Sequence, residues 1–248
     1  DKLWGIFDYN QQEPRLTVHY ASLTKQLGAE RAVSEYQNDN ADFHQIVADM
    51  ANIDRKKAKM INLGLSYGMG KQKLTMSLGI SEIEAEQLFA RYHKRVPFIR
   101  GLTNACMRKA SNKGHVTTLL GRKCRFNLYE PQNTRGIPLP YNQAVAKWGT
   151  EGLIRAYTYK ALNRVIQGSA ADMTKKAMLD LWKEGYVPYV QVHDELDIAV
   201  STKKEIEQIK EIMENCVKLQ VPNVVDIEIG ESWGTATKSY LEVFNEGN

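Results

Sequence analysis

Two adjacent carboxylates and an imidazole stand in the stretch YVQVHDELDIAV, between two short alternating runs that are typical of paired strands. His193, Asp194 and Glu195 would therefore form the tip of a hairpin. Because successive strand residues point to opposite faces, Asp194 and Glu195 cannot both point fully into one small site without a turn. Asp is also common in ordinary turns, so the tip alone is explained by either a plain turn or a metal site.

A further carboxylate, Asp8, ends the apolar run LWGIFDY, which is typical of a buried strand. Taken alone, Asp8 is better explained as the cap of the following turn. A carboxylate at a strand exit and another at a hairpin tip could nevertheless meet across a sheet, and they would repel each other unless a cation lay between them. Mg²⁺ is held in this way, by one or two carboxylates together with substrate phosphates.

Two cations, an apolar residue and an aromatic residue stand four positions apart in the stretch RKKAKMINLGLSYGMG. Arg55, Lys59, Leu63 and Tyr67 would form one stripe along a helix. A solvated basic face explains the two cations, but it explains Tyr67 next to Gly68 and Gly70 poorly. Cations at the start of a helix oppose its dipole unless an anion such as a polyphosphate lies there. A carboxylate pair facing such a helix has the components of two-metal phosphoryl transfer.

The elements that must position these residues follow from the pattern of the whole chain. The helix that begins near residue 82 has Ser81 as its expected N-cap. Strands at both ends of the chain around a helical middle predict an α+β domain with a helical insertion. In chain order we expect a strand at 3–8, a helix at 13–27, helices over 43–113, strands in 114–128, a loop at 129–140, helices over 142–183 that split near Gly168, the hairpin, a helix over 203–218 and a strand at 224–230.

Composition sets wider limits on the class of protein. The 248 residues are 43% hydrophobic and 25% charged, which is typical of a globular protein with a substantial core. The three cysteines form no CxxC pair, so a structural zinc site or disulfide framework is not expected. No stretch approaches the ~20 apolar residues of a membrane span. A net charge of +4 permits nucleic-acid binding without requiring it.

The quoted stretches resemble, in order, motifs A, B and C of the family A DNA polymerases, the bacterial polymerase I group and its phage relatives. DYNQQEPR resembles the family's DYSQIELR, RKKAKMINLGLSYG resembles its motif B helix, and QVHDEL matches motif C. Further similarities are DFH around His44, NRVIQGSAADMTKKAM and IEIGESW. The resemblance extends over essentially all 248 residues.

The resemblance implies a two-metal catalytic centre. Asp8 and Asp194 would bind two Mg²⁺ ions, with Glu195 as an accessory carboxylate. One ion would lower the pKa of the primer 3′-hydroxyl, and the other would hold the triphosphate and leaving pyrophosphate. Lys59 would be the general acid for that pyrophosphate.

The same resemblance implies residues for nucleotide and DNA. Glu13 would exclude a ribose 2′-hydroxyl, and Tyr67 would stack beside the templating position. Nucleotide binding is thus expected at Arg55, Lys59, His44, Leu63, Tyr67, Gln11 and Glu13. Contacts with the DNA, in part at its minor groove, are expected at Asn163, Gln167, His193, Tyr67 and Gly68.

The implied architecture is an antiparallel-sheet palm with a helical fingers insertion. Residues 1–40 and 141–248 would be palm, with the motif C hairpin at 189–200, and residues 41–140 would be fingers, with the motif B helix at 55–68. The implied activity is DNA-templated addition of dNTPs to a primer 3′ end. The implied partners are primer–template DNA and dNTPs, with no membrane, in the cytoplasm of a bacterium or phage-infected host.

Several departures from the family pattern qualify this expectation. Leu63 replaces a usual aromatic residue, motif A carries Asn10, Gln12 and Pro14, and the stretch 129–159 is longer than the family minimum. The resemblance begins at motif A, so the thumb and exonuclease of the family have no counterpart in these residues. We keep the alternative of an incomplete polymerase half that binds nucleic acid or a partner and is active only when a separate chain or missing segment complements it. An RNA polymerase or reverse transcriptase is disfavoured by Glu13 and by motif B.

Overall fold

The computed structural model describes residues 2–38, 42, 44–45, 48–49, 52–66, 69–133 and 136–245. They form two compact units. Unit 1 comprises Asp1–Leu16 and Ser169–Asn248, and unit 2 comprises Thr17–Gly168. Helix α1 (Gln12–Leu23) and helix α9 (Ala161–Lys183) each contribute to both units. The palm and fingers boundaries stay a prediction, because compactness alone does not test them.

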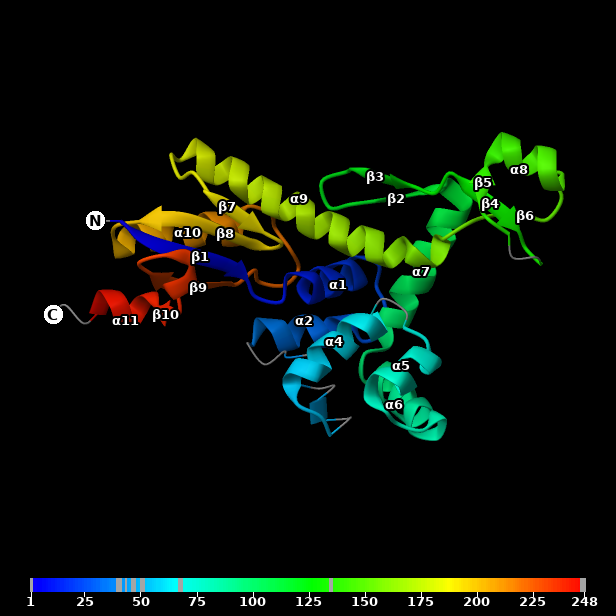
Figure 1. The fold of residues 1–248 in the computed structure, drawn as a ribbon, viewed down its shortest axis with the longest axis horizontal. Coiled ribbons are helices and arrows are strands. Elements are labelled where there is room, and N and C mark those ends of the chain that lie inside the picture. The colour runs from blue at the N-terminus through cyan, green and yellow to red at the C-terminus, as the bar shows by residue number, and fades with distance from the viewer. Residues whose placement is uncertain are drawn as a thin grey trace. The chain divides into compact units, whose positions relative to one another are not determined.

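Unit 1 is built on a five-stranded antiparallel sheet with the order β10-β9-β1-β8-β7 (Figure 1). This unit, together with the small sheets and helices of unit 2, gives the predicted α+β class. The strands are β1 (Leu3–Tyr9), β7 (Val190–Val192), β8 (Glu195–Val200), β9 (Val225–Gly230) and β10 (Lys238–Ser239). The short elements η2 (Trp233–Thr235) and α11 (Tyr240–Asn245) complete the unit.

One face of this sheet is covered by α9 and by α10 (Lys203–Asn215). Phe7 and Leu196 point to that face and are buried against Met173 of α9 and Ile206 of α10. Helix α10 begins with a capping box between Thr202 and Glu205, which satisfies backbone donors that the first turn leaves free. The alternate residues of the strands, among them Asp8, therefore lie on the opposite face.

Unit 2 is largely helical. Helix α6 has the predicted Ser81 N-cap, whose hydroxyl accepts a hydrogen bond from the backbone N–H of Glu84. Besides α1 and α9, the helices whose bounds the structure describes in this unit are α2 (Ala29–Gln37), α4 (Arg55–Ser66), α5 (Lys71–Leu78), α6 (Glu82–Arg95), α7 (Pro97–Lys113) and α8 (Tyr141–Trp148). Its strands are β2 (His115–Thr117), β3 (Lys123–Arg125), β4 (Leu128–Pro131), β5 (Leu139–Pro140) and β6 (Leu153–Arg155), followed by η1 (Thr158–Lys160).

Two expectations from the sequence were wrong in unit 2. The predicted loop at 129–140 contains β4 and β5, which join β6 in a three-stranded sheet. The predicted helix over 142–183 is interrupted at 149–160, where Gly149, Gly152 and Tyr157 adopt positive φ. It is not interrupted at Gly168, because α9 continues through that residue. Gly168 instead permits close packing, since a Cβ there would lie 2.7 Å from Cγ2 of Thr118.

The described part of the chain contains no helix that is both long and apolar enough to cross a membrane.

Candidate active site

The predicted carboxylates meet at one end of neighbouring strands in unit 1. Asp8 of β1 lies directly opposite Glu195 of β8 in the antiparallel register. The backbone N–H of Tyr9 donates to the carbonyl oxygen of Asp194 at 3.4 Å, so the hairpin tip is held against the exit of β1. Residues far apart in sequence are thus brought together by strand pairing, which the sequence pattern could not show.

The hairpin tip is a two-residue turn, because Val192 pairs with Glu195. His193 adopts a left-handed conformation with φ 57°, as tight hairpin turns require. Its ring Nδ1 lies 3.0 Å from Oδ1 of Asp194. The side-chain amide of Gln191 donates to the carbonyl oxygen of His193 at 2.6 Å. Motif C therefore fixes the Asp194 carboxylate through its immediate neighbours.

The face of the sheet that carries Asp8 is strongly acidic. Ile6 lies opposite both Asp197 of β8 and Glu228 of β9, so these side chains share the face of Asp8. We call this set of carboxylates the acidic face: Asp8, Glu195, Asp197, Asp226 and Glu228. Like charges at this spacing are unfavourable without a counter-ion.

Sequence reasoning missed Asp197, whose only signal was an acid inside the apolar strand LDIAV. Its side chain is wholly buried, and within the described residues neither carboxyl oxygen has a hydrogen-bond donor. Burial raises the pKa of Asp197. Burial, and next the nearby Asp197 carboxylate, also raise the pKa of Glu195. Asp197 and Glu195 therefore both hold protons more tightly than ordinary carboxyl groups.

The donor set is compatible with Mg²⁺. Asp8 and Asp194 offer only oxygen ligands, which hard divalent cations prefer. Within the described residues no three His, Cys, Asp or Glu side chains come together as a complete metal site. Mg²⁺ usually keeps several waters and takes the rest of its ligands from substrate phosphates, so two carboxylates suffice.

The turn after β1 is held by Arg15, which is buried. Its Nε donates to the carbonyl oxygen of Asn10 at 2.8 Å, and its Nη1 donates to the carbonyl oxygen of Pro222 at 2.8 Å. The Asn10 amide in turn donates to Asp226 at 2.9 Å. Gln11 has φ 52° in this turn, and Glu13 lies in the first turn of α1. Motif A is thus tied to the segment that enters β9.

The predicted phosphate-binding residues lie in unit 2 around the start of α4. Arg55 donates to Asp42 at 2.8 Å. His44 is buried, and its Nδ1 lies 3.1 Å from the amide nitrogen of Asn62. Burial, and then the charges of Arg55 and Lys59, lower the pKa of His44, although Asp42 opposes them.

Asp42 links this cluster electrostatically. Burial alone would raise the pKa of Asp42, but hydrogen bonds from Arg55 and from the backbone N–H groups of Gln45 and His44 bring it below the usual value. Arg55 is therefore already paired with a carboxylate in this structure.

The remaining predicted residues are placed in part. Tyr67 and Gly68 lie outside the described residues, as does the side chain of Leu63. Asn163 and Gln167 are one helical turn apart on α9 and share a face of that helix. His193 lies in unit 1 and is exposed.

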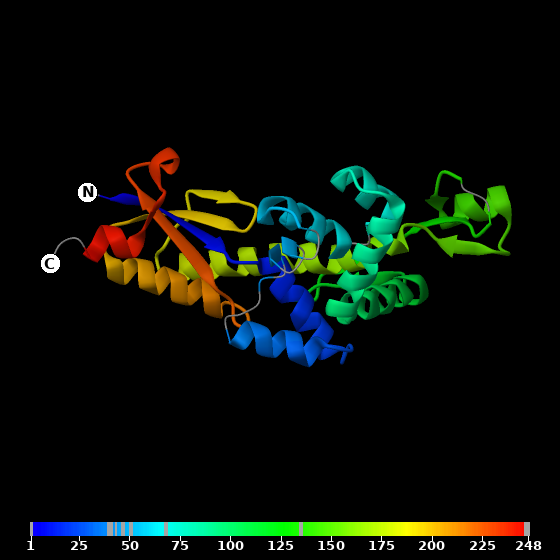
Figure 2. The ribbon, with the colours of Figure 1, turned by 90° about the horizontal axis from the view of Figure 1, so that it is seen from below.

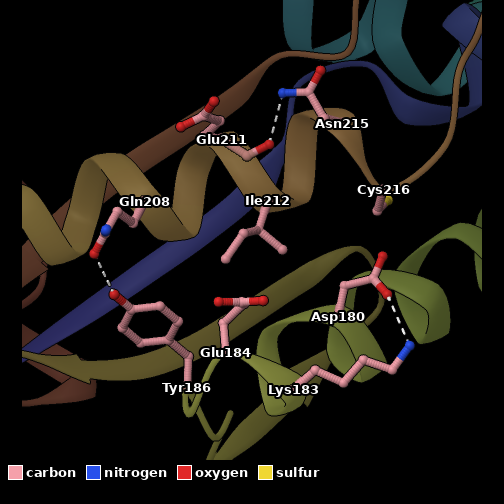
Figure 3. A pocket seen from close by; sticks show the side chains of 9 residues that line it. All are labelled: Asp180, Lys183, Glu184, Tyr186, Gln208, Glu211, Ile212, Asn215 and Cys216. Carbon is pink, nitrogen blue, oxygen red and sulfur yellow. Dashed lines mark hydrogen bonds and ion pairs between the residues drawn. The ribbon is translucent and has the colours of Figure 1, made fainter.

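A cavity of about 590 Å³ lies elsewhere in unit 1, between α9 and α10 (Figure 3). Asp180, Tyr186 and Cys216 are among the side chains around it, and the hydroxyl of Tyr186 donates to Gln208 at 2.6 Å. None of its nine lining residues belongs to the predicted site.

Comparisons with known proteins identify the family. A model described as DNA polymerase family A matches residues 2–235. The DNA-directed DNA polymerase of Pseudomonas phage M6 is 38% identical to this chain, and the aligned region covers 93% of this chain and 38% of the phage protein. DNA polymerase I of Bacillus caldotenax is 34% identical, over 93% of this chain and 26% of its own length.

A solved structure agrees with this assignment. It is the POL domain of Pol1 from M. smegmatis in complex with DNA primer-template and dNTP, with a TM-score of 0.73 and 27% identity, over 94% of this chain and 40% of that one. The chain therefore spans well under half the length of these relatives. With the family model matching from β1 to η2, the chain belongs to the family A DNA polymerases.

Proposed function

We propose that this chain carries out DNA-templated DNA synthesis by adding dNTPs to a primer 3′ end. The observation that carries the proposal is the register that pairs Asp8 with Glu195 and ties Tyr9 to Asp194. It collects motif A and motif C carboxylates at one end of a sheet. The M. smegmatis neighbour, whose complex contains primer-template DNA and dNTP, supports the same partners for this chain.

Asp8 and Asp194 would hold two Mg²⁺ ions, and divalent metal use is general in the family. Bound there, the ions would lower the pKa of the primer 3′-hydroxyl and stabilise charge on the triphosphate. Asp194 is oriented for this role by His193, and the turn after Asp8 is held by Arg15. Glu195 would act as an accessory carboxylate beside them.

The cluster at the start of α4 would receive the β- and γ-phosphates. Arg55 would exchange its Asp42 partner for a phosphate oxygen, because both are anions that accept from a guanidinium. Lys59 would contact the triphosphate and donate a proton to the leaving pyrophosphate. His44, held by Asn62, would present its ring from a fixed position.

Selection of sugar and base pair would fall to other residues. Glu13 would crowd a ribose 2′-hydroxyl, and Gln11, Leu63 and Tyr67 would line the nucleotide site. Asn163, Gln167 and His193 would contact the minor groove, where acceptors are common to all base pairs. Residues 1–40 and 141–248 would act as palm and 41–140 as fingers, in the cytoplasm of a bacterial or phage-infected cell.

A second candidate is an incomplete polymerase half that is active only when complemented. It is favoured by the extent of the relatives, since this chain matches only 38% of the phage M6 polymerase. The thumb of a polymerase grips DNA through phosphate contacts, which supply much of the affinity. A partner chain or preceding segment would provide them.

The test is Mg²⁺-dependent primer extension by the chain, alone and after addition of a polypeptide that supplies the preceding polymerase segment. Asp194→Asn should abolish extension in either setting. Glu211→Gln, an exposed carboxyl on α10, is the matched control and should extend normally. Extension only after complementation would favour the second candidate. Equal extension by the Asp194→Asn variant would overturn the proposed site.

A further inference from the structure

Residues 128–133 and 136–160 form a small lobe of unit 2, which we call the aromatic lobe. It consists of the sheet β5-β4-β6 and the helix α8, which lie beyond α7 (Figures 1 and 2), and of η1, which packs against α7 at the base of the lobe. Of its described residues, only Ala144 and Ala156 are buried. The lobe therefore has almost no core of its own and leaves its large side chains at the surface.

Those exposed side chains are apolar and aromatic. Tyr141 is 50% exposed, Tyr159 is 59% exposed and Ile137 is 81% exposed. Large exposed apolar side chains gathered in one small part of a folded protein can mark a binding surface. The identity of the ligand has to come from what surrounds the rings.

The rings are accompanied by cations. Nζ of Lys160 lies 4.9 Å from the ring centroid of Tyr157 and 5.6 Å from that of Tyr159. Nζ of Lys147 lies 5.1 Å from the ring of Trp148. Tyr129 and Tyr141 are in edge contact with ring centroids 5.0 Å apart. Flat rings alternating with flexible ammonium groups can stack bases and neutralise phosphates.

Charge favours the same ligand. Residues 101–168, which include the lobe, contain eleven Lys and Arg against two Asp and Glu, whereas the whole chain contains 33 against 29. The rest of the chain is therefore net acidic. Lys123 and Arg125, on the hairpin that leads into the lobe, are exposed. A polyanion is complementary to this basic segment. Nucleic acid fits it better than an acidic protein surface does, because only nucleic acid has bases on which the rings can stack.

One cation of the lobe has a structural role instead. Nη1 of Arg155 donates to the carbonyl oxygen of Phe126 at 2.9 Å, and its guanidinium lies 4.9 Å from the ring centroid of Tyr129. Arg155 thus fastens the lobe to the segment that follows β3. Lys147 and Lys160, which are exposed, are left to contact phosphates.

We infer that the aromatic lobe is a binding surface for single-stranded nucleic acid, with Tyr159, Lys160 and Tyr141 as its principal contacts. Single strands are favoured because exposed rings stack on unpaired bases, which a duplex keeps stacked on one another. This surface goes beyond the proposed polymerase function and does not depend on the carboxylates Asp8 and Asp194.

The inference is tested by fluorescence anisotropy of a short labelled oligo(dT) with the full chain. Tyr159→Ala and Tyr141→Ala should each weaken binding by about 5- to 150-fold, the range for loss of one stacked base. Tyr159→Phe, which keeps the ring, should bind nearly normally. Lys160→Gln should also flatten the slope of log affinity against log salt by about 0.7.

Two control variants distinguish binding at the aromatic lobe from binding elsewhere on the chain. Trp182→Ala removes a ring in unit 1 that is 65% exposed, and it should leave oligo(dT) binding unchanged. Asp194→Asn should lose primer extension yet keep oligo(dT) binding, so failure of the proposed function and failure of this inference are distinguishable. If both tyrosine variants bound oligo(dT) as tightly as the parent chain, the inference would be overturned. It would also be overturned if the variants changed only self-association of the chain, because the lobe would then bind protein.

Discussion

At the scale of single residues, the candidate site depends on buried polar groups that are not themselves ligands. Arg15 satisfies carbonyl groups from two segments, at Asn10 and Pro222. Asp197 is the opposite case, because it is buried without a donor among the described residues. Arg15 therefore stabilises the candidate site, whereas the buried Asp197 beside the site lowers the stability of the fold.

Arg15→Ala should lower the free energy of unfolding by about 2–4 kcal/mol, because two backbone carbonyls lose charge-assisted donors in a buried turn. Denaturant unfolding measures the change. Arg31→Ala is the control, since the exposed Arg31 side chain pairs with Glu35 at i,i+4, and it should cost less than about 0.5 kcal/mol. Equal losses in the two variants would show that the Arg15 contacts contribute nothing special.

Asp197→Val should raise the free energy of unfolding by about 1–3 kcal/mol at alkaline pH, because it removes an unpaired buried carboxyl. The folded protein has a raised pKa at Asp197. The stability that this group contributes is therefore full below its unfolded pKa and is lost as pH rises through the folded pKa. The advantage of the variant should shrink as pH falls, and unfolding at several pH values would reveal it. A pH-independent difference would argue against the raised pKa.

At the scale of elements, the acidic face and the close packing of α9 are the features with measurable consequences. The face collects carboxylates from β1, β8 and β9. Helix α9 passes the β2–β3 hairpin at Gly168, where the neighbouring atoms leave no room for a side chain.

Millimolar Mg²⁺ should raise the thermal midpoint of the chain, because a cation that binds only the folded acidic face stabilises it. At a free concentration ten times Kd the gain is about 1.4 kcal/mol, or roughly 3–6 °C for a domain of this size. Asp8→Asn should lose most of the shift in a thermal melt. NaCl at matched ionic strength controls for screening, and an equal shift with NaCl would mean that no specific site exists.

Gly168→Ala should destabilise the chain by about 1–3 kcal/mol, because its Cβ would overlap the Thr118 methyl group. Gly234→Ala, where no atom lies within 4 Å of the added Cβ, should stay within about 0.5 kcal/mol of the parent. Calorimetric melting of the two variants gives the comparison. If Gly168→Ala were as stable as Gly234→Ala, α9 would not be packed as closely as described.

At the scale of the whole molecule, the sequence predicted what is locally encoded. The hairpin at 190–200, the Ser81 cap and the helix from Lys203 follow from alternation, capping residues and apolar periodicity, and each is present. The sheet at 128–155 was not predictable, since its strands are two to four residues long and lie among prolines and glycines. Gly168 was misjudged because local propensity cannot anticipate a packing contact with Thr118.

The candidate site shows the same division. Motif spacing selected Asp8, Asp194 and the α4 cations, and strand register then placed Asp8 beside the hairpin tip. The Asp42 partner of Arg55 and the burial of Asp197 depend on tertiary contacts that no spacing rule contains. The two units also differ in charge, with 23 Lys and Arg against 11 Asp and Glu in unit 2 and the reverse sign in unit 1.

The central position of β1 has a consequence for the order in which the chain acquires its structure. Leu3 pairs with Val200 on one side of β1, and Trp4 pairs with Gly230 on the other. During synthesis β1 must wait for both neighbours, because all of unit 2 is translated between them, while the helices of unit 2 can form as they appear. The carboxylates of motifs A and C would therefore meet only after unit 2 and the strand β8 have been synthesised, so that a nascent chain that stops within unit 2 lacks the predicted site.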